Sequence, residues 1–412
     1  MTTKIKIPSI LLLILLSIIF LNSNAETMNI TEEIFSISTT DKLATIDGSI
    51  TFPNVKSNKK SIPIIFIGGS YSSRDGETYV RPDRPLRNEK FWYRIVAHNL
   101  SNAGFAVVRY DNRGMASVLE CEKNRTHQLD PYEYALGTPQ CYNMDAVATT
   151  TFESKREDIQ SIFAMMAKDK RLDAKQVIII AHSEGTFHIS RLISEKKINP
   201  ASVIFLCGPG RSPSETLRWQ NIDNQISWIE KHVQQNGGFI SSEKILQLFE
   251  KETPRFKNIL LSEKIKGWSI VDLPSGKKRL TELYQNDIKA FSGLPTTGVL
   301  TGTMDNGAIN NIAFGASRLY LSLLTDKLRT VDLLKGYRGS VSFIYGKRDA
   351  VIPVNKEIAT IKQDHQLGKR ATIIEIDDMD HNFALPDGHI SEIGINALIQ
   401  EALRLHSAAR FN

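Results

Sequence analysis

The sequence predicts an α/β protein with a mostly parallel central sheet, flanking helices and an inserted helical unit. Continuously apolar runs of strand length alternate with amphipathic helical segments from residue 62 to residue 206, and the alternation resumes at residue 340. Strands that alternate with helices pair in parallel, and a strand buried on both faces is apolar throughout. Between these two parts the sequence is helical and contains scattered aromatic residues, which indicates an insertion.

The N-terminal segment has the pattern of a secretory signal peptide. Lys4 and Lys6 precede an apolar run from Ile10 to Leu21, and Ser23–Ala25 supplies the small residues of a cleavage position. About a dozen apolar residues are fewer than the roughly 20 that cross a bilayer, which disfavours the alternative of a transmembrane anchor. We therefore expect residues 1–25 to be removed, the protein to be periplasmic or secreted, and the mature chain to have no stable membrane anchor.

Length, charge and cysteine content limit the function classes. A chain of 412 residues can bury one large core plus one further unit. The formal net charge of +6 is mild, and no block of basic residues indicates a nucleic-acid partner. Cys121 and Cys141 share one long connection, so in an exported chain we predict a disulfide between them, with two free thiols as the alternative. Cys207 lies in an apolar run and is predicted to be a buried thiol.

The first part of the predicted core covers residues 26–212. Ile34–Thr39 and Leu43–Phe52 alternate apolar and polar residues, which favours an antiparallel hairpin at a sheet edge, and Asp47-Gly48 indicates a turn or bulge. Further strands are predicted at Ile62–Ile67, Phe105–Tyr110, Val177–Ile180 and Ala201–Leu206, and helices at Asn88–Ala103, Glu153–Lys168 and Thr186–Lys196. The connection Met115–Thr151 is too long for a plain loop and is interpreted as an excursion over the active-site edge.

The second part of the core, residues 336–412, follows a helical cap predicted at residues 213–335. Strands are expected at Ser340–Tyr345 and Ala371–Ile376, and helices at Val354–Leu367 and Ile390–His406. The cap contains Trp219, Trp228, Phe249, Trp268, Tyr284, Phe291 and Tyr320. We interpret each aromatic residue as cap core rather than as a substrate contact.

Ser183 follows a β-branched run and precedes helical sequence, within Ala181-His182-Ser183-Glu184-Gly185. A sharp turn between strand and helix has a strained backbone that requires small residues two positions before and after its centre. The pattern therefore predicts that the Ser183 hydroxyl is exposed above the sheet edge.

A serine hydroxyl becomes a nucleophile when an imidazole removes its proton and a carboxylate orients that imidazole. Asp349 follows one predicted strand and His381 follows the next, and the carboxyl ends of parallel strands meet at one sheet edge. We therefore predict a triad of Ser183, Asp349 and His381. The alternatives are a surface role for His381 and an orienting role for a nearer carboxylate, Asp377, Asp378 or Asp380.

Backbone N–H groups of Glu184 and of Gly69 or Ser70 are the candidates for an oxyanion hole, since one begins a helix and the others lie in a glycine turn. The Glu184 side chain is interpreted as a structural or solvated carboxylate, with attraction of a cationic substrate group as the alternative. His182 is expected to pack against the neighbouring strand loop.

Several of these motifs together resemble the α/β-hydrolase fold serine hydrolases, in particular bacterial acyl hydrolases and esterases related to serine aminopeptidases. The resemblance rests on Gly68-Gly69-Ser70 with Arg74-Asp75-Gly76, on Arg109–Gly114, on Ala181–Gly185, where Ala181 replaces the usual first Gly, and on Cys207–Arg211. It covers residues 62–211 and 340–405 and implies the fold and the triad. The resemblance is weak in the cap and in Met115–Thr151, which are the parts that select a substrate. Asp111 and Arg113 are interpreted as structural residues.

The sequence therefore predicts an exported hydrolase that cleaves a small-molecule carboxylic ester through an acyl-enzyme. No metal or organic cofactor is implied, because no His, Asp and Glu cluster has ligand spacing. The alternatives are an amidase or aminopeptidase with the same triad, and a binding protein that retains the fold without the chemistry.

Overall fold

The computed structural model describes residues 30–54, 59–70, 72–76, 91–117, 143–252, 266–293 and 317–409. The predicted signal peptide, residues 1–25, lies outside these ranges, and so do Cys121 and Cys141 with their predicted disulfide.

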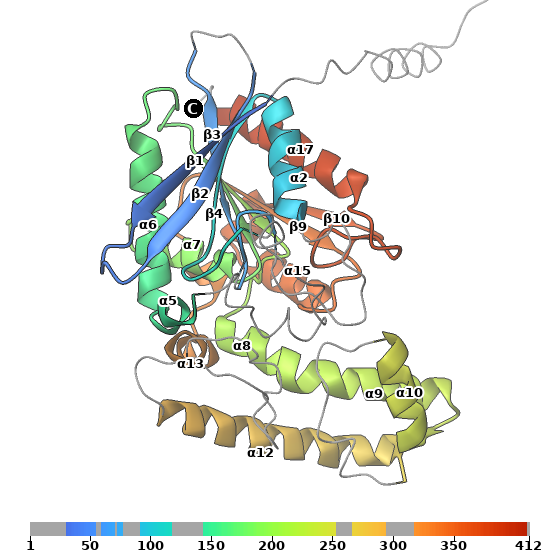
Figure 1. Cartoon of the computed structure of the whole chain (residues 1–412). Helices are drawn as coiled ribbons and strands as arrows, with labels where there is room; N and C mark the ends of the chain where they lie inside the picture. The colour runs from blue at the N-terminus through green and yellow to red at the C-terminus, as the bar shows by residue number, and fades with distance from the viewer. Residues whose placement is uncertain are drawn as a thin grey trace, which may run out of the picture.

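An eight-stranded sheet forms the centre of the protein (Figure 1). Its order is β1-β2-β4-β3-β5-β6-β9-β10. The strands are β1 (Thr31–Ser38), β2 (Thr45–Phe52), β3 (Ile62–Ile67), β4 (Phe105–Tyr110), β5 (Ile178–His182), β6 (Ser202–Leu206), β9 (Ser340–Gly346) and β10 (Thr372–Ile376). β2 pairs antiparallel with both β1 and β4, and the remaining pairs are parallel, so the carboxyl ends of β3, β5, β6, β9 and β10 lie at one edge.

Helices cover both faces of the sheet (Figure 1). One face packs against α6 (Phe152–Lys168), α7 (Gly185–Ser194), α14 (Thr330–Leu333) and α15 (Val354–Gln363). The other face packs against α2 (Trp92–Asn102) and α17 (Glu392–Ala409). Two short helices, α5 (Met144–Ala148) and α16 (Leu367–Arg370), complete the described part of the core.

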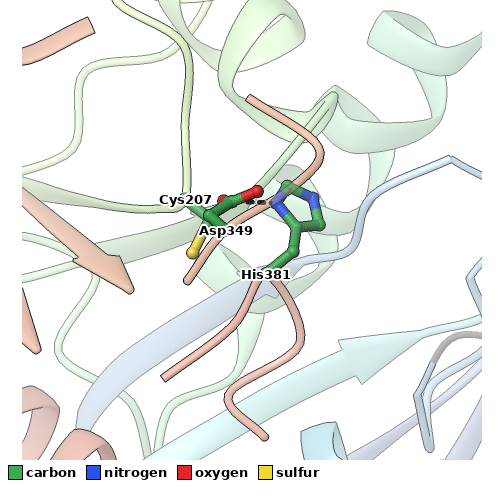
Figure 2. A group of neighbouring side chains, drawn as sticks. All are labelled: Cys207, Asp349 and His381. Atoms are coloured by element: carbon green, nitrogen blue, oxygen red, sulfur yellow. Dashed lines mark hydrogen bonds and ion pairs between the residues drawn. The ribbon is translucent and has the colours of Figure 1, made fainter. Parts of the chain in front are cut away.

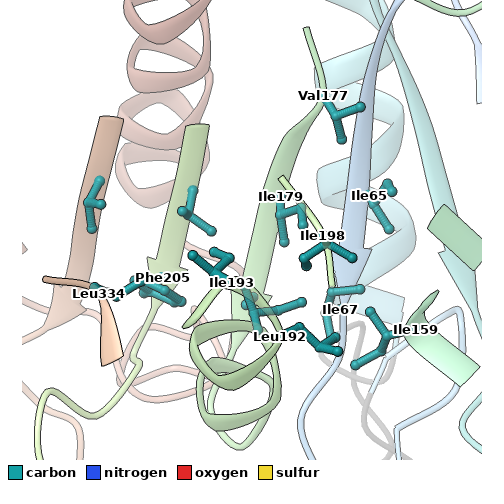
Figure 3. Packing of buried hydrophobic residues seen from close by; sticks show 14 of the residues in the cluster. Ile65, Ile67, Ile159, Val177, Ile179, Leu192, Ile193, Ile198, Phe205 and Leu334 are labelled. Carbon is teal, nitrogen blue, oxygen red and sulfur yellow. The ribbon is translucent and has the colours of Figure 1, made fainter. Parts of the chain in front are cut away.

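The larger core cluster consists of apolar side chains, mostly Ile, Val and Leu, from the central strands and the helices over them (Figure 3). Ile65, Ile179 and Phe205 come from three adjacent strands, and Ile159 and Leu192 come from α6 and α7. These side chains are at most 2% exposed, and burying each contributes about 1.5–3 kcal/mol. The central strands are therefore a rigid support for the loops at their carboxyl ends.

The predicted cap region is mainly helical and forms a layer at one end of the sheet (Figure 1). Its described elements are α8 (Pro213–Arg218), η2 (Trp219–Asp223), α9 (Asn224–Gln235), β7 (Phe239–Ile240), α10 (Ser242–Glu252), β8 (Trp268–Ser269), η3 (Ile270–Asp272), α12 (Leu273–Ser292) and α13 (Ser317–Thr325). Trp268, Tyr284 and Phe291 are buried in its own apolar cluster, as the sequence predicts. Val331, inside the predicted cap range, instead joins the core of the sheet.

The cap contacts the loop that follows β9. Gln220 Nε2 donates a hydrogen bond to the carbonyl oxygen of Val351 at 2.9 Å, and Asn224 Nδ2 donates to that of Ala350 at 3.3 Å. The acceptors are the first and second residues after Asp349, so the cap is anchored beside the predicted active-site edge.

The structure confirms the α/β-hydrolase fold and the predicted strands of the sheet, with differences of a few residues at their ends. The expectation for Asp47-Gly48 is wrong: both residues pair with β1 in continuous register, so neither a turn nor a bulge interrupts β2. Gly48 is needed there because a Cβ atom would lie 2.2 Å from the Phe35 ring and 2.6 Å from the Arg109 carbonyl oxygen.

None of the helices in the described ranges combines the length and the apolar character that crossing a membrane requires.

The loop after β4 is held by a buried ion pair. The Arg113 guanidinium is bidentate to Asp158 on α6, with N–O distances of 2.8 and 3.1 Å, and it also contacts Asp41 at 2.5 Å. Asp111, in the same loop, accepts hydrogen bonds from the backbone and side chain of Arg74 at 2.6 and 3.1 Å. These contacts give Asp111 and Arg113 structural roles.

We predict that Arg113→Met lowers the free energy of unfolding by about 3–5 kcal/mol, because it leaves the buried Asp158 carboxylate without its main partner. Urea denaturation measures the change. The double variant Arg113→Met/Asp158→Leu should recover part of the loss, since it removes both charges. Independent, fully additive effects of the two substitutions would contradict the pairing.

Candidate active site

Ser183 lies at the turn between β5 and α7, in a left-handed backbone conformation with φ of 52°. Its N–H donates to the carbonyl oxygen of Leu206 at 3.1 Å. A Cβ atom on Gly185 would lie 2.9 Å from the Gly68 carbonyl oxygen and 3.0 Å from that of Ile67, so only glycine allows this approach. Ser183 is partly exposed while the residues on either side of it are buried. The turn thus presents one hydroxyl at the sheet edge, as the sequence predicts.

The structure brings Ser183, His381 and Asp349 into one hydrogen-bonded row. His381 Nδ1 lies 2.7 Å from Asp349 Oδ2, and its Nε2 lies 2.9 Å from Ser183 Oγ. Because an ionised carboxylate can only accept, Nδ1 carries the proton of a neutral ring and Nε2 is left to accept the serine O–H. This arrangement is suited to removing the serine proton.

The Asp349 carboxylate is completely buried, and its Oδ1 accepts the N–H groups of Val351 and Ile352 at 2.7 and 3.0 Å. Its position is therefore set by the backbone of its own loop. One oxygen is held by these two donors while the other faces His381.

The three nearer aspartates have other surroundings. Asp377 pairs with Lys347 at the surface, at 2.6 Å, and Asp378 is exposed. Asp380 Oδ1 accepts the N–H groups of Asn382 and Ala384 at 2.8 and 3.0 Å, which shapes the loop that presents His381.

Cys207 lies beside this row, immediately after β6, and is buried as predicted. Its sulfur and ligand atoms of Asp349 and His381 lie within 4.8 Å of one another, so these three residues are a candidate metal site among the described residues (Figure 2). Burial and the neighbouring Asp349 charge raise the pKa of the Cys207 thiol well above its usual value. A metal requires the thiolate and would displace the bond between Asp349 and His381, so the residues fit a triad better than a metal site.

The glycine turn after β3 packs against the Ser183 turn, and the two predicted oxyanion donors in it differ. The Gly69 N–H already donates to the Tyr93 hydroxyl at 3.0 Å, and the Gly69 carbonyl oxygen accepts from Asn112 at 3.0 Å. No acceptor among the described residues is bonded to the N–H of Ser70 or of Glu184. The geometry therefore favours Ser70 over Gly69 as the partner of Glu184.

His182 joins the glycine turn to the loop of His381. Its Nε2 lies 3.0 Å from the His381 carbonyl oxygen, which can only accept, so Nε2 carries the proton. Its Nδ1 then accepts from the Tyr93 hydroxyl at 2.8 Å, and that hydroxyl in turn accepts the Gly69 N–H. His182 is thus a buried structural residue, as expected, although the sequence did not indicate its link through Tyr93.

The Glu184 side chain is buried and paired. Its Oε1 accepts from Lys155 Nζ at 2.6 Å and from His188 Nε2 at 3.1 Å, and its Oε2 accepts from Ser70 Oγ at 2.5 Å. The sequence did not single out Lys155 or His188, because both lie on helices whose pattern indicates only an amphipathic surface. The structural interpretation of this carboxylate agrees with these contacts.

No protein-family model matches the chain, and no curated protein matches it. The chain is similar to the solved structure of Est1E from Butyrivibrio proteoclasticus, with 13% identity, coverage of 91% of this chain and 99% of that chain, and a TM-score of 0.47. It is also similar to the structure of a thermophilic esterase from Thermogutta terrifontis, with 13% identity, coverage of 91% of this chain and 99% of that chain, and a TM-score of 0.43. A third similar structure is an acylaminoacyl peptidase from Pyrococcus horikoshii, with 12% identity, coverage of 94% of this chain and 41% of that chain, and a TM-score of 0.43. These identities and TM-scores are too low to indicate a function, so the function is inferred from the geometry of the chain itself.

We predict that Asp349→Asn lowers kcat for ester hydrolysis by about 10⁴, because an amide no longer fixes the tautomer of His381. Asp377→Asn removes only a surface ion pair, and Asp380→Asn retains the acceptor oxygen, so both should stay close to wild type. Steady-state kinetics of the three purified variants test this. A near-normal Asp349→Asn enzyme beside an inactive loop variant would assign the orienting role to the wrong carboxylate.

Proposed function

We propose that this chain is a serine hydrolase that cleaves carboxylic esters through an acyl-enzyme on Ser183. The single observation that supports it most is the row of hydrogen bonds from Asp349 through His381 to the partly exposed hydroxyl of Ser183. A serine held only for structure has no need of an oriented base at this distance.

In the proposed acylation step, His381 Nε2 takes the Ser183 proton as Oγ attacks the ester carbonyl carbon. The carbonyl π electrons move to oxygen, and the N–H groups of Glu184 and Ser70 stabilise the resulting oxyanion. When the tetrahedral intermediate collapses, the C–O bond to the leaving group breaks and His381 returns the proton to the departing alkoxide. Asp349 stabilises the imidazolium throughout and keeps its own charge.

In the proposed deacylation step, a water molecule takes the place of the alcohol. His381 removes its proton as it attacks the acyl carbon, and the proton then passes to Ser183 Oγ as the acyl bond breaks. The products are a carboxylic acid and an alcohol, and the residues return to their starting protonation. None of these steps needs a metal ion or an organic cofactor.

The aminopeptidase alternative loses its main support. It relied on the Glu184 carboxylate to bind a substrate amine, and that carboxylate is buried and accepts hydrogen bonds from three protein groups. The binding-protein alternative is disfavoured because a protein that only binds does not need Ser183, His381 and Asp349 in one hydrogen-bonded row.

We also propose that the enzyme acts outside the cytoplasm, on the basis of the signal-peptide pattern ending at Ala25. Protein recovered from the periplasm or the medium should therefore begin at Glu26.

An exported chain is also expected to contain the predicted disulfide, so non-reducing peptide mapping should show Cys121 joined to Cys141. Closing a loop of about 20 residues would stabilise the protein by roughly 3 kcal/mol in the chain-entropy model. Alkylation of both thiols without prior reduction would rule the disulfide out.

We predict that Ser183→Ala removes nearly all hydrolysis of p-nitrophenyl acetate while the protein remains folded, because Ala fits the small-residue turn but has no hydroxyl. A residual rate of roughly 10³-fold over water is compatible with stabilisation by the oxyanion donors alone. Circular dichroism controls for folding.

Parallel assays on aminoacyl p-nitroanilides compare amide with ester cleavage. Wild-type turnover of esters by Ser183→Ala would disprove the nucleophile assignment, and preferential cleavage of the anilides would replace the esterase proposal with the aminopeptidase one.

A further inference from the structure

We propose that Ser70, Glu184 and Lys155 form a side-chain clamp that fixes the distance between the two oxyanion N–H donors, so that Ser70 and Lys155 are positioning residues for the reaction. This inference depends on the proposed function, because it concerns how the same site stabilises its oxyanion.

The clamp joins the same two residues whose backbone N–H groups are proposed to bind the oxyanion. Ser70 Oγ donates to Glu184 Oε2 at 2.5 Å, although the two residues lie 114 positions apart in the chain. Ser70 belongs to the turn after β3, and Glu184 belongs to the Ser183 turn. The other hydrogen-bonded link between the turns runs from the Gly69 N–H through the Tyr93 hydroxyl to His182, so the Ser70–Glu184 bond is the one that joins the two donor residues directly.

The Glu184 carboxylate is a suitable anchor because it is itself held firmly. Lys155 Nζ and His188 Nε2 both donate to its Oε1, and all three side chains are at most 7% exposed. Burial alone would raise the pKa of the Glu184 carboxyl, but the Lys155 charge and the His188 hydrogen bond hold that pKa well below its usual range. The carboxylate is therefore ionised and strengthens its bond to Ser70.

Lys155 reaches Glu184 from the first turn of α6, and the start of that helix is well defined. Thr151 caps the helix by accepting the Ser154 N–H at 3.0 Å, and the Ser154 hydroxyl bonds the Thr151 N–H at 2.8 Å in return. Such reciprocal capping fixes the first turn. The position of Lys155, and through it that of Glu184, is thus set by a local sequence signal in α6.

Two oxyanion donors reach their full effect only when both point at the same developing charge, and displacement of a positioned group by about 1 Å can cost 10²-fold in rate. Substitution of the Ser70 side chain leaves the Ser70 N–H in the backbone, but in this proposal the side chain determines where that N–H lies. Removing the hydroxyl should therefore impair the transition state more than substrate binding.

The test compares Ser70→Ala, Ser70→Thr and Lys155→Met with wild type, each rate being divided by the active sites titrated with a fluorophosphonate. We expect Ser70→Ala to lower kcat by about 10- to 100-fold with KM nearly unchanged. Ser70→Thr, which retains the hydroxyl, should recover most of the loss. An aryl trifluoromethyl ketone, which forms an oxyanion on Ser183, should lose affinity by the same factor as kcat/KM.

Lys155→Met should also lower kcat, and the double variant Ser70→Ala/Lys155→Met should be little worse than the poorer single variant, because both substitutions release one clamp. Lys168→Met, at the exposed end of α6, and Ser161→Ala, on its outer surface, are matched controls that should keep wild-type kinetics. A purely structural role for the clamp would lower the titrated fraction or the melting temperature while kcat per titrated site stayed constant.

Wild-type kcat per site in Ser70→Ala, with Ser183→Ala inactive, would overturn the clamp and leave the proposed function standing. Equal losses in Ser70→Ala and Ser70→Thr would also overturn it, since the hydroxyl would then not be the group responsible. A wild-type protein with neither ester turnover nor a fluorophosphonate titre would overturn the proposed function and the clamp together.

Discussion

The left-handed backbone of Ser183 is the constraint on which the rest of the site depends. A residue other than glycine with φ of 52° costs about 1–3 kcal/mol, and it persists only where its surroundings determine it. Here β5 is paired on both sides by parallel strands, and Gly185 lies against the carbonyl oxygens of Ile67 and Gly68. The close approach that makes the sharp turn possible also brings the glycine turn beside Ser183, so the proposed nucleophile and its proposed oxyanion donors are assembled by one packing requirement.

The side chains of His182 and Glu184, on either side of Ser183, are buried, and hydrogen bonds offset the cost of burial. Glu184 has Lys155, His188 and Ser70 as donors, and His182 lies between Tyr93 and the carbonyl oxygen of His381. A half-satisfied network would be destabilising in such a low-dielectric environment, whereas a satisfied one restricts the side chains to one arrangement. The two networks together connect the glycine turn with the loops of Ser183 and His381, which is the preorganisation that the proposed acyl transfer requires.

The fold and the positions of Ser183, Asp349 and His381 could be predicted from the sequence because each follows a strand with a strong apolar signal, and parallel strands end at one edge. The choice between Gly69 and Ser70 as oxyanion donor could not be predicted. It depends on the Tyr93 hydroxyl, which accepts the Gly69 N–H, and Tyr93 lies on a helix whose sequence pattern indicates only an amphipathic surface. Asp47-Gly48 misled the prediction because the same dipeptide suits a turn and a strand that passes close to an aromatic ring. Cap packing follows from contacts between irregular helical segments, so the sequence pattern does not define a substrate pocket.

The most direct test of the proposed chemistry is a crystal structure of the protein after reaction with a fluorophosphonate ester. We predict a covalent bond from Ser183 Oγ to phosphorus, with the phosphoryl oxygen within hydrogen-bond distance of the N–H groups of Ser70 and Glu184. Phosphorus bonded to another residue, or a phosphoryl oxygen directed away from both N–H groups, would contradict the account.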